Sequence, residues 1–372
     1  MPFEQGPIRP PSEAESLIIR AIRNCPWNKC LFCSIYKEKF SWRTVEEIKE
    51  DILAMKEAKE KVLMYADRLG EAEVTGEVIH LVYDQAPDLL QVALWLFKGG
   101  KNVFLQDGDA IVMPPDKLAE VLYFVREQFP SVERITTYGR SKTISRRTVE
   151  QLKMLKEAGL TRVHIGLDSG YDPLLKYMQK GVTAEEHIKA GLMVKEAGLS
   201  LSENVYLGLG GRQYWREHAL DTAMVLSAID PQFVRLRTFV PRKESLLMKY
   251  IENGEFQVQN DDGLALEERL LLQNFDGTGY LASDHILNLL EEVEGQLPDA
   301  MEKSINIVNN YLNMSQEDRE HFSLGRRLGL YRSLKDTDDP FLFYQVEEVK
   351  TSLKHRGKDL EEFITECMAN YI

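Results

Sequence analysis

The chain has 372 residues and a formal net charge of −13 at pH 7, and 44% of its residues are hydrophobic, which is typical of a folded globular protein. The negative charge argues against a broad surface for nucleic acid, because such binding depends on Lys and Arg that neutralise phosphates. No apolar run approaches the roughly 18 residues of a membrane-spanning helix. The start, MPFEQGPIRPPSEAE, lacks the pattern of a secretory signal, so we expect a cytoplasmic protein.

Short β-branched runs alternate with segments of helical periodicity along the first 240 residues. The first helical segment, 44–61, opens with Thr44 and Glu47 at the spacing of a capping box. Strands that alternate with helices of this length predict βα units around a parallel sheet. The candidate strands are 17–23, 102–107, 134–139, 162–167, 203–208 and 233–238.

Two of these units resemble each other. Segments 155–167 and 194–209 both run from a helix through a glycine to a strand, and Gly159 and Gly198 suit the left-handed position that ends a helix. The repetition predicts a barrel or an open parallel sheet, and six strands are too few for a complete eight-stranded barrel. We therefore expect an α/β fold with a partial (β/α)6 barrel of the TIM type.

The sequence also predicts where the barrel ends. Residues 63–98 lie in a long gap between the first helix and the second strand, and we expect them to form a helical insertion. One further strand is expected within 277–299. We assign residues 1–285 to the barrel and residues 286–372 to a helical C-terminal appendage.

Three of the four cysteines lie on one loop after the first strand. Cys25, Cys30 and Cys33 form a C-x4-C-x2-C motif, and Cys367 is remote. Clustered thiols in a cytoplasmic protein indicate metal or redox chemistry. Three thiolates do not complete a tetrahedral zinc site, but they suit a [4Fe–4S] cluster with one iron left open. A structural zinc knuckle or a group of buried thiols is the alternative.

This loop, with aromatic Phe32 just before the last cysteine, resembles the radical S-adenosylmethionine (SAM) superfamily, in particular its Elp3-like (elongator catalytic subunit-like) and HemN-like partial-barrel group. The superfamily usually shows C-x3-C-x2-C, so this chain has one additional residue. The resemblance implies a [4Fe–4S] cluster on the three cysteines and SAM at the open iron. It also implies a 5′-deoxyadenosyl radical, oxygen sensitivity, and an electron donor such as flavodoxin or ferredoxin.

The resemblance further implies cofactor-binding residues at the C-terminal ends of the strands. Asp107, Gly108 and Asp109 stand where the superfamily has a Gly-Gly-Glu turn for the SAM amino group, and solvated turn acids are the alternative. Asp168 and Ser169 resemble the residues near the SAM ribose, unless Asp168 caps the next helix. Arg140, Arg235 and Arg237 lie at strand ends and suit the SAM carboxylate, and spacing does not decide between them. Arg235 and Arg237 share one side of their strand. The remaining candidates are Phe32, Tyr138 and Asn204.

Candidate substrate-binding residues follow the last strand and the cysteine loop. Asp284, His285 and Asn288 belong to the segment SDHILN, for which a helix N-cap at Ser283 or Asp284 is the alternative. Tyr36 and Lys37 follow the cysteine loop and face either the cavity or solvent. The arginines of GRRLGLYR (325–332) are expected on a solvated helix face, with an anchor for an anionic substrate as the alternative.

Three functions follow from these expectations. The favoured one is a radical SAM enzyme that abstracts hydrogen from a small molecule, with nucleic acid an unlikely partner and no membrane association. The second is a radical SAM enzyme that modifies tRNA or another macromolecule, and the third is a non-enzymatic iron–sulfur or zinc protein. The substrate and the catalytic residues stay unknown at this stage, because variable loops rather than shared motifs determine the substrate.

Overall fold

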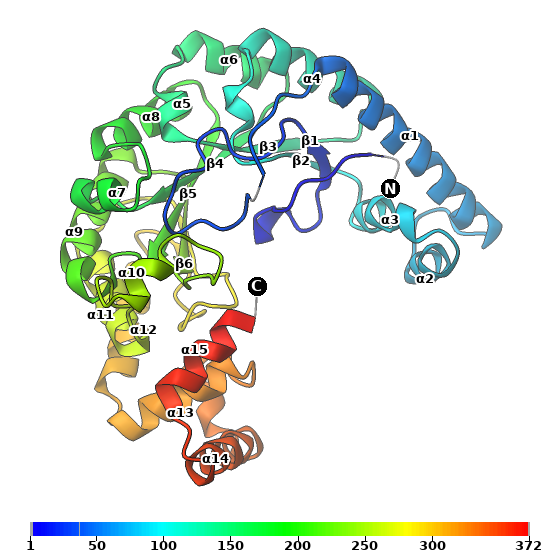
Figure 1. The fold of residues 1–372 in the computed structure, drawn as a ribbon. Helices are drawn as coiled ribbons and strands as arrows, with labels where there is room; N and C mark the ends of the chain where they lie inside the picture. Colours follow the sequence, from blue (N-terminus) through cyan, green and yellow to red (C-terminus); the bar gives the residue numbers. More distant parts are fainter. Residues whose placement is uncertain (1–2, 37, 371–372) are drawn as a thin grey trace. The chain divides into compact units, whose positions relative to one another are not determined.

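The structure is a computed structural model that describes residues 3–36 and 38–370, and it has an α/β fold (Figure 1). Within these residues a strand is followed by one or more helices six times in succession, from β1 to α11. This confirms the predicted fold class. The described residues divide into two compact units, which we treat separately: 3–28, 35–36, 38–165 and 189–201 form the first, and 29–34, 166–188 and 202–370 form the second.

The first unit is built on parallel strands that pair in chain order. β1 pairs with β2, β2 with β3, and β3 with the start of β4. Their apolar side chains are buried, as the short β-branched runs predict. The strands are β1 (Leu17–Arg20), β2 (Asn102–Gln106), β3 (Arg134–Gly139) and β4 (Arg162–Asp168), whose last three residues belong to the second unit.

Helices α1, α4 and α6 form a row in which each packs on the next, outside the strands of the first unit (Figure 1). Residues 63–98 contain the end of α1 and then α2, η2 and α3. The helices and 3₁₀ turns are η1 (Pro11–Glu13), α1 (Val45–Arg68), α2 (Gly76–Gln85), η2 (Pro87–Leu89), α3 (Leu90–Phe97), η3 (Ala110–Val112), α4 (Pro115–Gln128), α5 (Ser141–Ile144), α6 (Val149–Glu157) and α8 (Ala184–Glu196), which begins in the second unit.

The second unit continues the parallel pattern. β5 (Ser200–Leu207) pairs with β6 (Phe233–Thr238), and β6 pairs with the predicted further strand, β7 (Tyr280–Ala282). A short strand that the sequence did not predict, β8 (Gly295–Gln296), pairs antiparallel with β7. In the β5–β6 register Asn204 lies opposite Arg235, and Tyr206 lies opposite Arg237, so these four side chains share one face.

The rest of the second unit is helical, which confirms the predicted helical extension. Helix α11 packs between α9 and α12, and α13 packs against α14 and α15 near the C-terminal end (Figure 1). The helices are α7 (Asp172–Tyr177), α9 (Gly211–Ile229), α10 (Met248–Glu252), α11 (Asp261–Asn274), α12 (Met301–Asn313), α13 (Gln316–Arg327), η4 (Leu334–Asp338), α14 (Pro340–His355) and α15 (Leu360–Asn370).

Local signals placed the helix ends well. Thr44 and Glu47 form the predicted capping box, in which the Thr44 hydroxyl accepts from the Glu47 backbone and the Glu47 carboxylate accepts from the Thr44 backbone. Gly159 and Gly198 end their helices with φ of 120° and 73°. The first helix is longer than predicted, because its periodicity continues to Arg68 rather than ending at residue 61.

Candidate radical SAM site

The cysteine loop lies between β1 and α1 and passes from the first unit into the second. In the first unit the Cys25 sulfur accepts from the Asn28 backbone at 3.5 Å. A Cβ atom added to Gly108 would lie 3.1 Å from Cys25 Cβ and 3.1 Å from Tyr36 Oη. Glycine is therefore the residue that lets the turn after β2 approach the cysteine loop this closely.

In the second unit the loop contributes Cys30 and Cys33. The Cys33 backbone N–H donates to the Cys30 carbonyl at 3.2 Å, so the two thiols project from a tight turn. Backbone hydrogen bonds from Leu31 to Met178 and from Leu247 to Leu31 hold this turn in the unit. Phe32 packs edge-to-face against Tyr206 and Phe239, with ring centroids 6.0 and 6.2 Å apart. The aromatic residue between the cysteines is thus anchored in an apolar cluster.

The residues present fit an iron–sulfur cluster. All four cysteines lie within the described residues, and all four are half-buried. Within residues 3–36 and 38–370, no three His, Cys, Asp or Glu side chains are grouped to hold a single metal ion. A cube-shaped cluster does not need such a group, because each thiolate binds a different iron. Three thiols on an irregular loop beside a glycine turn are suitable donors for it.

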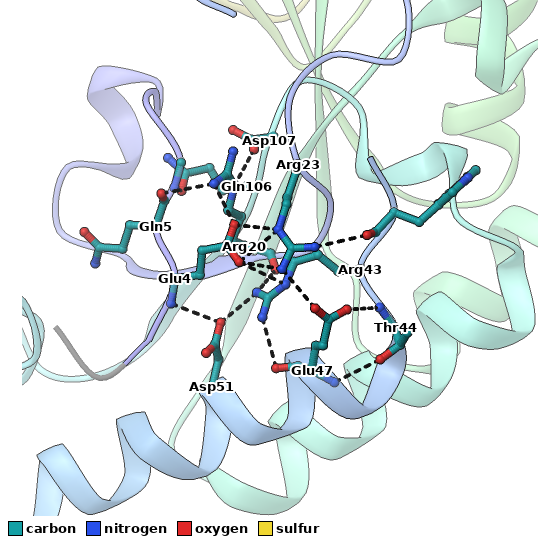
Figure 2. A network of polar contacts seen from close by, with 12 residues as sticks. Glu4, Gln5, Arg20, Arg23, Arg43, Thr44, Glu47, Asp51, Gln106 and Asp107 are labelled. Carbon is teal, nitrogen blue, oxygen red and sulfur yellow. Dashed lines mark hydrogen bonds and ion pairs between the residues drawn. The ribbon is translucent and has the colours of Figure 1, made fainter. Parts of the chain in front are cut away.

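Asp107 belongs to an ion-pair network that fastens the N-terminal segment to the ends of β1 and β2 (Figure 2). Arg20 donates to Asp107 at 2.7 Å and to Glu4 at 2.7 Å. The Asn24 backbone, next to Cys25, also donates to Asp107, at 3.0 Å. Burial raises the pKa of Asp107 above its ordinary value, although Asn24 and Arg20 oppose the shift. The N-terminal network consists of Glu4, Arg20, Arg23, Arg43, Glu47, Asp51 and Asp107.

Asp109 is fully buried, and both of its oxygens accept hydrogen bonds. The Arg140 backbone donates to Oδ1 at 3.2 Å, and the Thr143 hydroxyl donates to Oδ2 at 2.5 Å. Burial raises the pKa of Asp109 to about 6. Asp107 and Asp109 are both buried, so the alternative of solvated turn acids is wrong for both. In this structure Asp109 fixes the chain that leads into α5.

Tyr138 and Arg140 lie at the end of β3 in the first unit. The Tyr138 ring packs edge-to-face against Phe104 and His164, with centroids 5.2 and 6.1 Å apart. The Arg140 guanidinium lies 5.1 Å from the centroid of the Trp27 ring, which belongs to the cysteine loop. Arg140 is therefore held close to the chain that follows Cys25.

Asp168 and Ser169 end β4 in the second unit. Asp168 has a left-handed backbone with φ of 62° and forms an ion pair with Lys180. The Lys180 ammonium also lies 6.0 Å from the centroid of the Phe32 ring. The α7 N-cap is Tyr171 rather than Asp168, so the helix-capping alternative is wrong.

A buried histidine network holds Ser169. His218 Nδ1 lies 2.8 Å from the Ser169 hydroxyl, and its Nε2 lies 3.0 Å from the Tyr206 carbonyl. Burial lowers the pKa of His218 to about 4, so the ring is neutral at pH 7. The network joins the end of β4 to β5 through α9. Sequence inspection missed it because a lone histidine on a helix carries no spacing signal.

Glu203 on β5 is the most unusual buried side chain that the sequence analysis missed. It is fully buried, and neither carboxylate oxygen has a hydrogen-bond partner among the described residues. Burial, and then the negative charge of Asp168, raise its pKa well above the ordinary value. The sequence does contain a signal for Glu203, because an acidic residue is rare within a strand that is expected to be buried. Neighbouring Asn204 is half-buried on the opposite face of β5.

Arg235 and Arg237 on β6 both bind the carboxylate of Asp284, which follows β7. Arg235 Nη1 donates to Asp284 Oδ2, and Arg237 Nη1 donates to Oδ1 at 2.7 Å. The shared partner confirms that the two arginines face the same side of the strand. Burial opposes ionisation of Asp284, but the positive charges of Arg237 and Arg235 lower its pKa below the ordinary value. We call these three residues the Arg–Asp–Arg cluster.

His285 and Asn288 follow Asp284 on a loop rather than a helix, so the N-cap alternative for Ser283 or Asp284 is wrong. Burial, and then the charge of Arg237, lower the pKa of His285 to about 4. The Asn288 amide donates to the Leu236 carbonyl at 2.9 Å, and its oxygen accepts from the Thr238 backbone at 2.8 Å. Asn288 thus fastens this loop to β6. Lys37 lies outside the described residues.

The arginines of α13 contradict the expectation of a solvated helix face. Arg326 and Arg327 are 3% and 2% exposed. Arg326 forms an ion pair with Glu291, and Arg327 forms one with Asp261. Arg327 also donates to the Leu287 carbonyl at 2.6 Å, so these arginines support the loop that carries Asp284. Only tertiary packing reveals this role, since the acidic partners are distant in sequence.

A family model described as the radical SAM superfamily matches residues 19–223, which is more than half of the chain. The chain belongs to the radical SAM superfamily. Radical SAM proteins are enzymes that use a [4Fe–4S] cluster and SAM, so the predicted cofactors and the predicted enzyme class are confirmed. All three loop cysteines and the ends of β1 to β5 lie within the matched residues, whereas the Arg–Asp–Arg cluster lies outside them.

This radical SAM protein also resembles two curated proteins over a short stretch. It is 31% identical over 62 residues to a tRNA uridine(34) acetyltransferase from Methanocaldococcus jannaschii, and 32% identical over 62 residues to one from Methanocaldococcus infernus. Each match covers 17% of this chain and 12% of the relative. The expectation that nucleic acid is an unlikely partner is therefore not supported.

Several solved structures resemble the radical SAM protein at low identity. An Elp3 from Methanocaldococcus infernus has a TM-score of 0.44 and 16% identity, covering 62% of this chain and 60% of that one. Methylornithine synthase has a TM-score of 0.42 and 15% identity, covering 78% and 68%. Coproporphyrinogen III oxidase (HemN) from Escherichia coli has a TM-score of 0.42 and 14% identity, covering 69% and 50%.

In the part of the radical SAM protein that the structure describes, no helix is both long enough and apolar enough to span a bilayer.

Proposed function

We propose that this radical SAM enzyme generates a 5′-deoxyadenosyl radical that abstracts hydrogen from a small-molecule substrate. The observation that carries the proposal is the C-x4-C-x2-C loop within the matched family region, where the Gly108 turn lies close to Cys25. When bound, the cluster supplies the electron that cleaves the S–C5′ bond of SAM.

The chain's own residues provide binding and orientation. Cys25, Cys30 and Cys33 would each hold one iron and leave the fourth open for SAM. Gly108 allows the turn after β2 to approach the loop, and Phe32 fixes the loop in the aromatic cluster with Tyr206. Rigid support of this kind matters because hydrogen abstraction requires the reacting atoms to be held in contact geometry.

The test is anaerobic reconstitution with iron and sulfide, followed by dithionite and SAM, with release of 5′-deoxyadenosine as the measurement. We expect the wild type to release this product, and Cys30→Ala to lose both the product and the cluster absorbance. Cys367→Ala is the matched control, because Cys367 lies on α15, outside the loop, and should change neither. Failure of the reconstituted wild type to form 5′-deoxyadenosine would refute the proposal.

A second candidate substrate is tRNA, favoured by the 62-residue match to tRNA uridine(34) acetyltransferases. The net charge of −13 favours a small molecule instead. Titration of a tRNA pool into the reconstituted enzyme at about 50 and 150 mM salt distinguishes the two, since phosphate contacts weaken steeply with salt. Tight binding at the higher salt would favour tRNA.

A further inference from the structure

The Arg–Asp–Arg cluster carries more positive than negative charge. Two guanidinium groups share the single carboxylate of Asp284, which leaves a net charge of about +1 in the cluster. The arginine side chains are only 8% exposed, whereas the Asp284 side chain is 33% exposed. Buried charge without a full set of partners is costly, so a residual positive charge at this position needs an explanation.

The cluster also contains hydrogen-bond donors that nothing satisfies. In the described part of the chain, Arg235 Nε and Arg237 Nη2 are buried and have no hydrogen-bond partner. Leaving a charged donor unsatisfied costs more than any single neutral hydrogen bond returns. The partly exposed Asp284 shows that solvent reaches this cluster, so a ligand that approaches from solvent can supply the missing acceptor.

The surroundings add an apolar wall to the cationic cluster. Tyr206 lies opposite Arg237 in the strand register, and its ring packs against Phe239 with centroids 6.3 Å apart. Phe32 completes this aromatic group. His285, next to Asp284 in the chain, is neutral at pH 7 and can donate or accept a hydrogen bond. An oxyanion attached to an apolar or aromatic body matches this combination.

We propose that the Arg–Asp–Arg cluster is a substrate-recognition site in which Arg235 and Arg237 bind the carboxylate or phosphate group of a small-molecule substrate. This inference rests on the proposed function. The family match ends at residue 223, before β6, so the cluster lies outside the region shared with the family model. That position favours recognition of the substrate over recognition of the common cofactor, although the carboxylate of SAM offers the same chemistry.

The experiment is calorimetric titration of sodium phosphate, and separately sodium benzoate, into the anaerobically reconstituted enzyme with and without saturating SAM. We expect at least one of the two anions to bind at a single site with the same Kd under both conditions. Arg237→Gln removes one fork of charged donors and should weaken that Kd about tenfold or more. Asp284→Asn removes the competing carboxylate and should tighten it.

Two further variants control for folding and for nonspecific charge effects. Arg237→Lys keeps the positive charge but loses the planar guanidinium. Its anion Kd should therefore lie between those of the wild type and Arg237→Gln. Arg212→Gln removes an arginine that is 51% exposed and pairs with Glu361 on the surface, so it should leave the anion Kd unchanged. Cluster absorbance, measured for every variant, establishes that each one is folded.

Several outcomes overturn the inference. Binding of neither anion, or an unchanged Kd in folded Arg237→Gln, removes the site. Weaker binding in Asp284→Asn assigns the cluster a purely structural role. Competition between the anion and SAM, with weaker SAM binding in Arg237→Gln, assigns the site to the SAM carboxylate, and displacement of the anion by tRNA assigns it to RNA. The reconstituted wild type releases 5′-deoxyadenosine whichever of these outcomes occurs, so failure here is distinguishable from failure of the proposed function.

Discussion

The two compact units balance their charged side chains differently, and the comparison separates structural ion pairs from a candidate ligand site. The N-terminal network sets three arginines against four carboxylates, and Arg20 bridges Glu4 and fully buried Asp107. The Arg–Asp–Arg cluster sets two arginines against one carboxylate. In the N-terminal network the carboxylates outnumber the arginines, so each arginine can pair with a carboxylate. In the Arg–Asp–Arg cluster the arginines outnumber the carboxylates, so an additional anion can pair with them.

A second contrast concerns two carboxyl groups, half-buried Glu4 and buried Glu268. Burial opposes ionisation of Glu4, but the Arg23 hydrogen bonds and the charges of Arg43, Arg23 and Arg20 lower its pKa. In the second unit burial raises the pKa of Glu268 to about 8. Glu4 is therefore ionised at pH 7, and Glu268 is mostly protonated. The following predictions test this comparison.

The largest expected effect is on stability in the N-terminal network. Arg20→Gln leaves the Asp107 carboxylate buried without its charge partner, so the free energy of unfolding should fall by about 3–5 kcal/mol. Urea unfolding of the reconstituted enzyme measures the change. A loss below about 1 kcal/mol would mean that Asp107 is protonated or solvated after the substitution. The ion pairs of the network would then contribute little to stability.

The second prediction concerns pH and Glu268. Because its pKa is about 8 in the folded protein and near 4.5 when unfolded, the folded state holds a proton that the unfolded state has released between these values. The contribution of Glu268 to the free energy of unfolding is at its full value below about pH 4.5. It declines as the pH rises, by about 1.4 kcal/mol per pH unit, until the pH passes the folded pKa. Glu268→Gln should remove the Glu268 share of the slope between about pH 5.5 and 7.5, whereas Glu267, whose pKa burial also raises to about 8, keeps its own share. An identical slope in the variant would show that Glu268 is ionised in the folded protein.

The third prediction is a smaller loss of stability in the Arg–Asp–Arg cluster. Arg237→Gln leaves Asp284 still paired with Arg235, and Asp284 is partly exposed, so the free energy of unfolding should fall by only about 1 kcal/mol. The measurement is the same urea titration used for Arg20→Gln. Equal losses in the two variants would erase the distinction between a structural network and a ligand site.

The smallest expected effect is at the surface. The Arg212–Glu361 ion pair is 51% and 59% exposed, and Arg212→Gln should change stability by less than about 1 kcal/mol. High salt should reduce even this difference, because exposed charges are screened. A larger loss in the variant would indicate that Arg212 supports the packing of α15 through more than its charge.

Periodicity and short-range spacing made much of the fold predictable. The strands 134–139 and 233–238 have the predicted bounds, and the other strands differ at their ends by up to three residues. The capping box at Thr44 and the glycine stops at Gly159 and Gly198 are local signals, because each depends on neighbouring backbone groups only. The cysteine motif is local in the same sense, and together with its place after the first strand of the βα series it predicts the family.

Sequence alone determined the βα series, the cysteine loop and the chemistry these residues can perform. Tertiary structure alone decided which charged side chains meet: Arg20 with Asp107, Arg235 with Asp284, and the burial of Arg326 and Arg327 that sequence analysis placed in solvent. The physical reason is distance along the chain. Partners such as Arg20 and Asp107 are separated by 87 residues, and no periodic pattern encodes a contact made only when the chain folds.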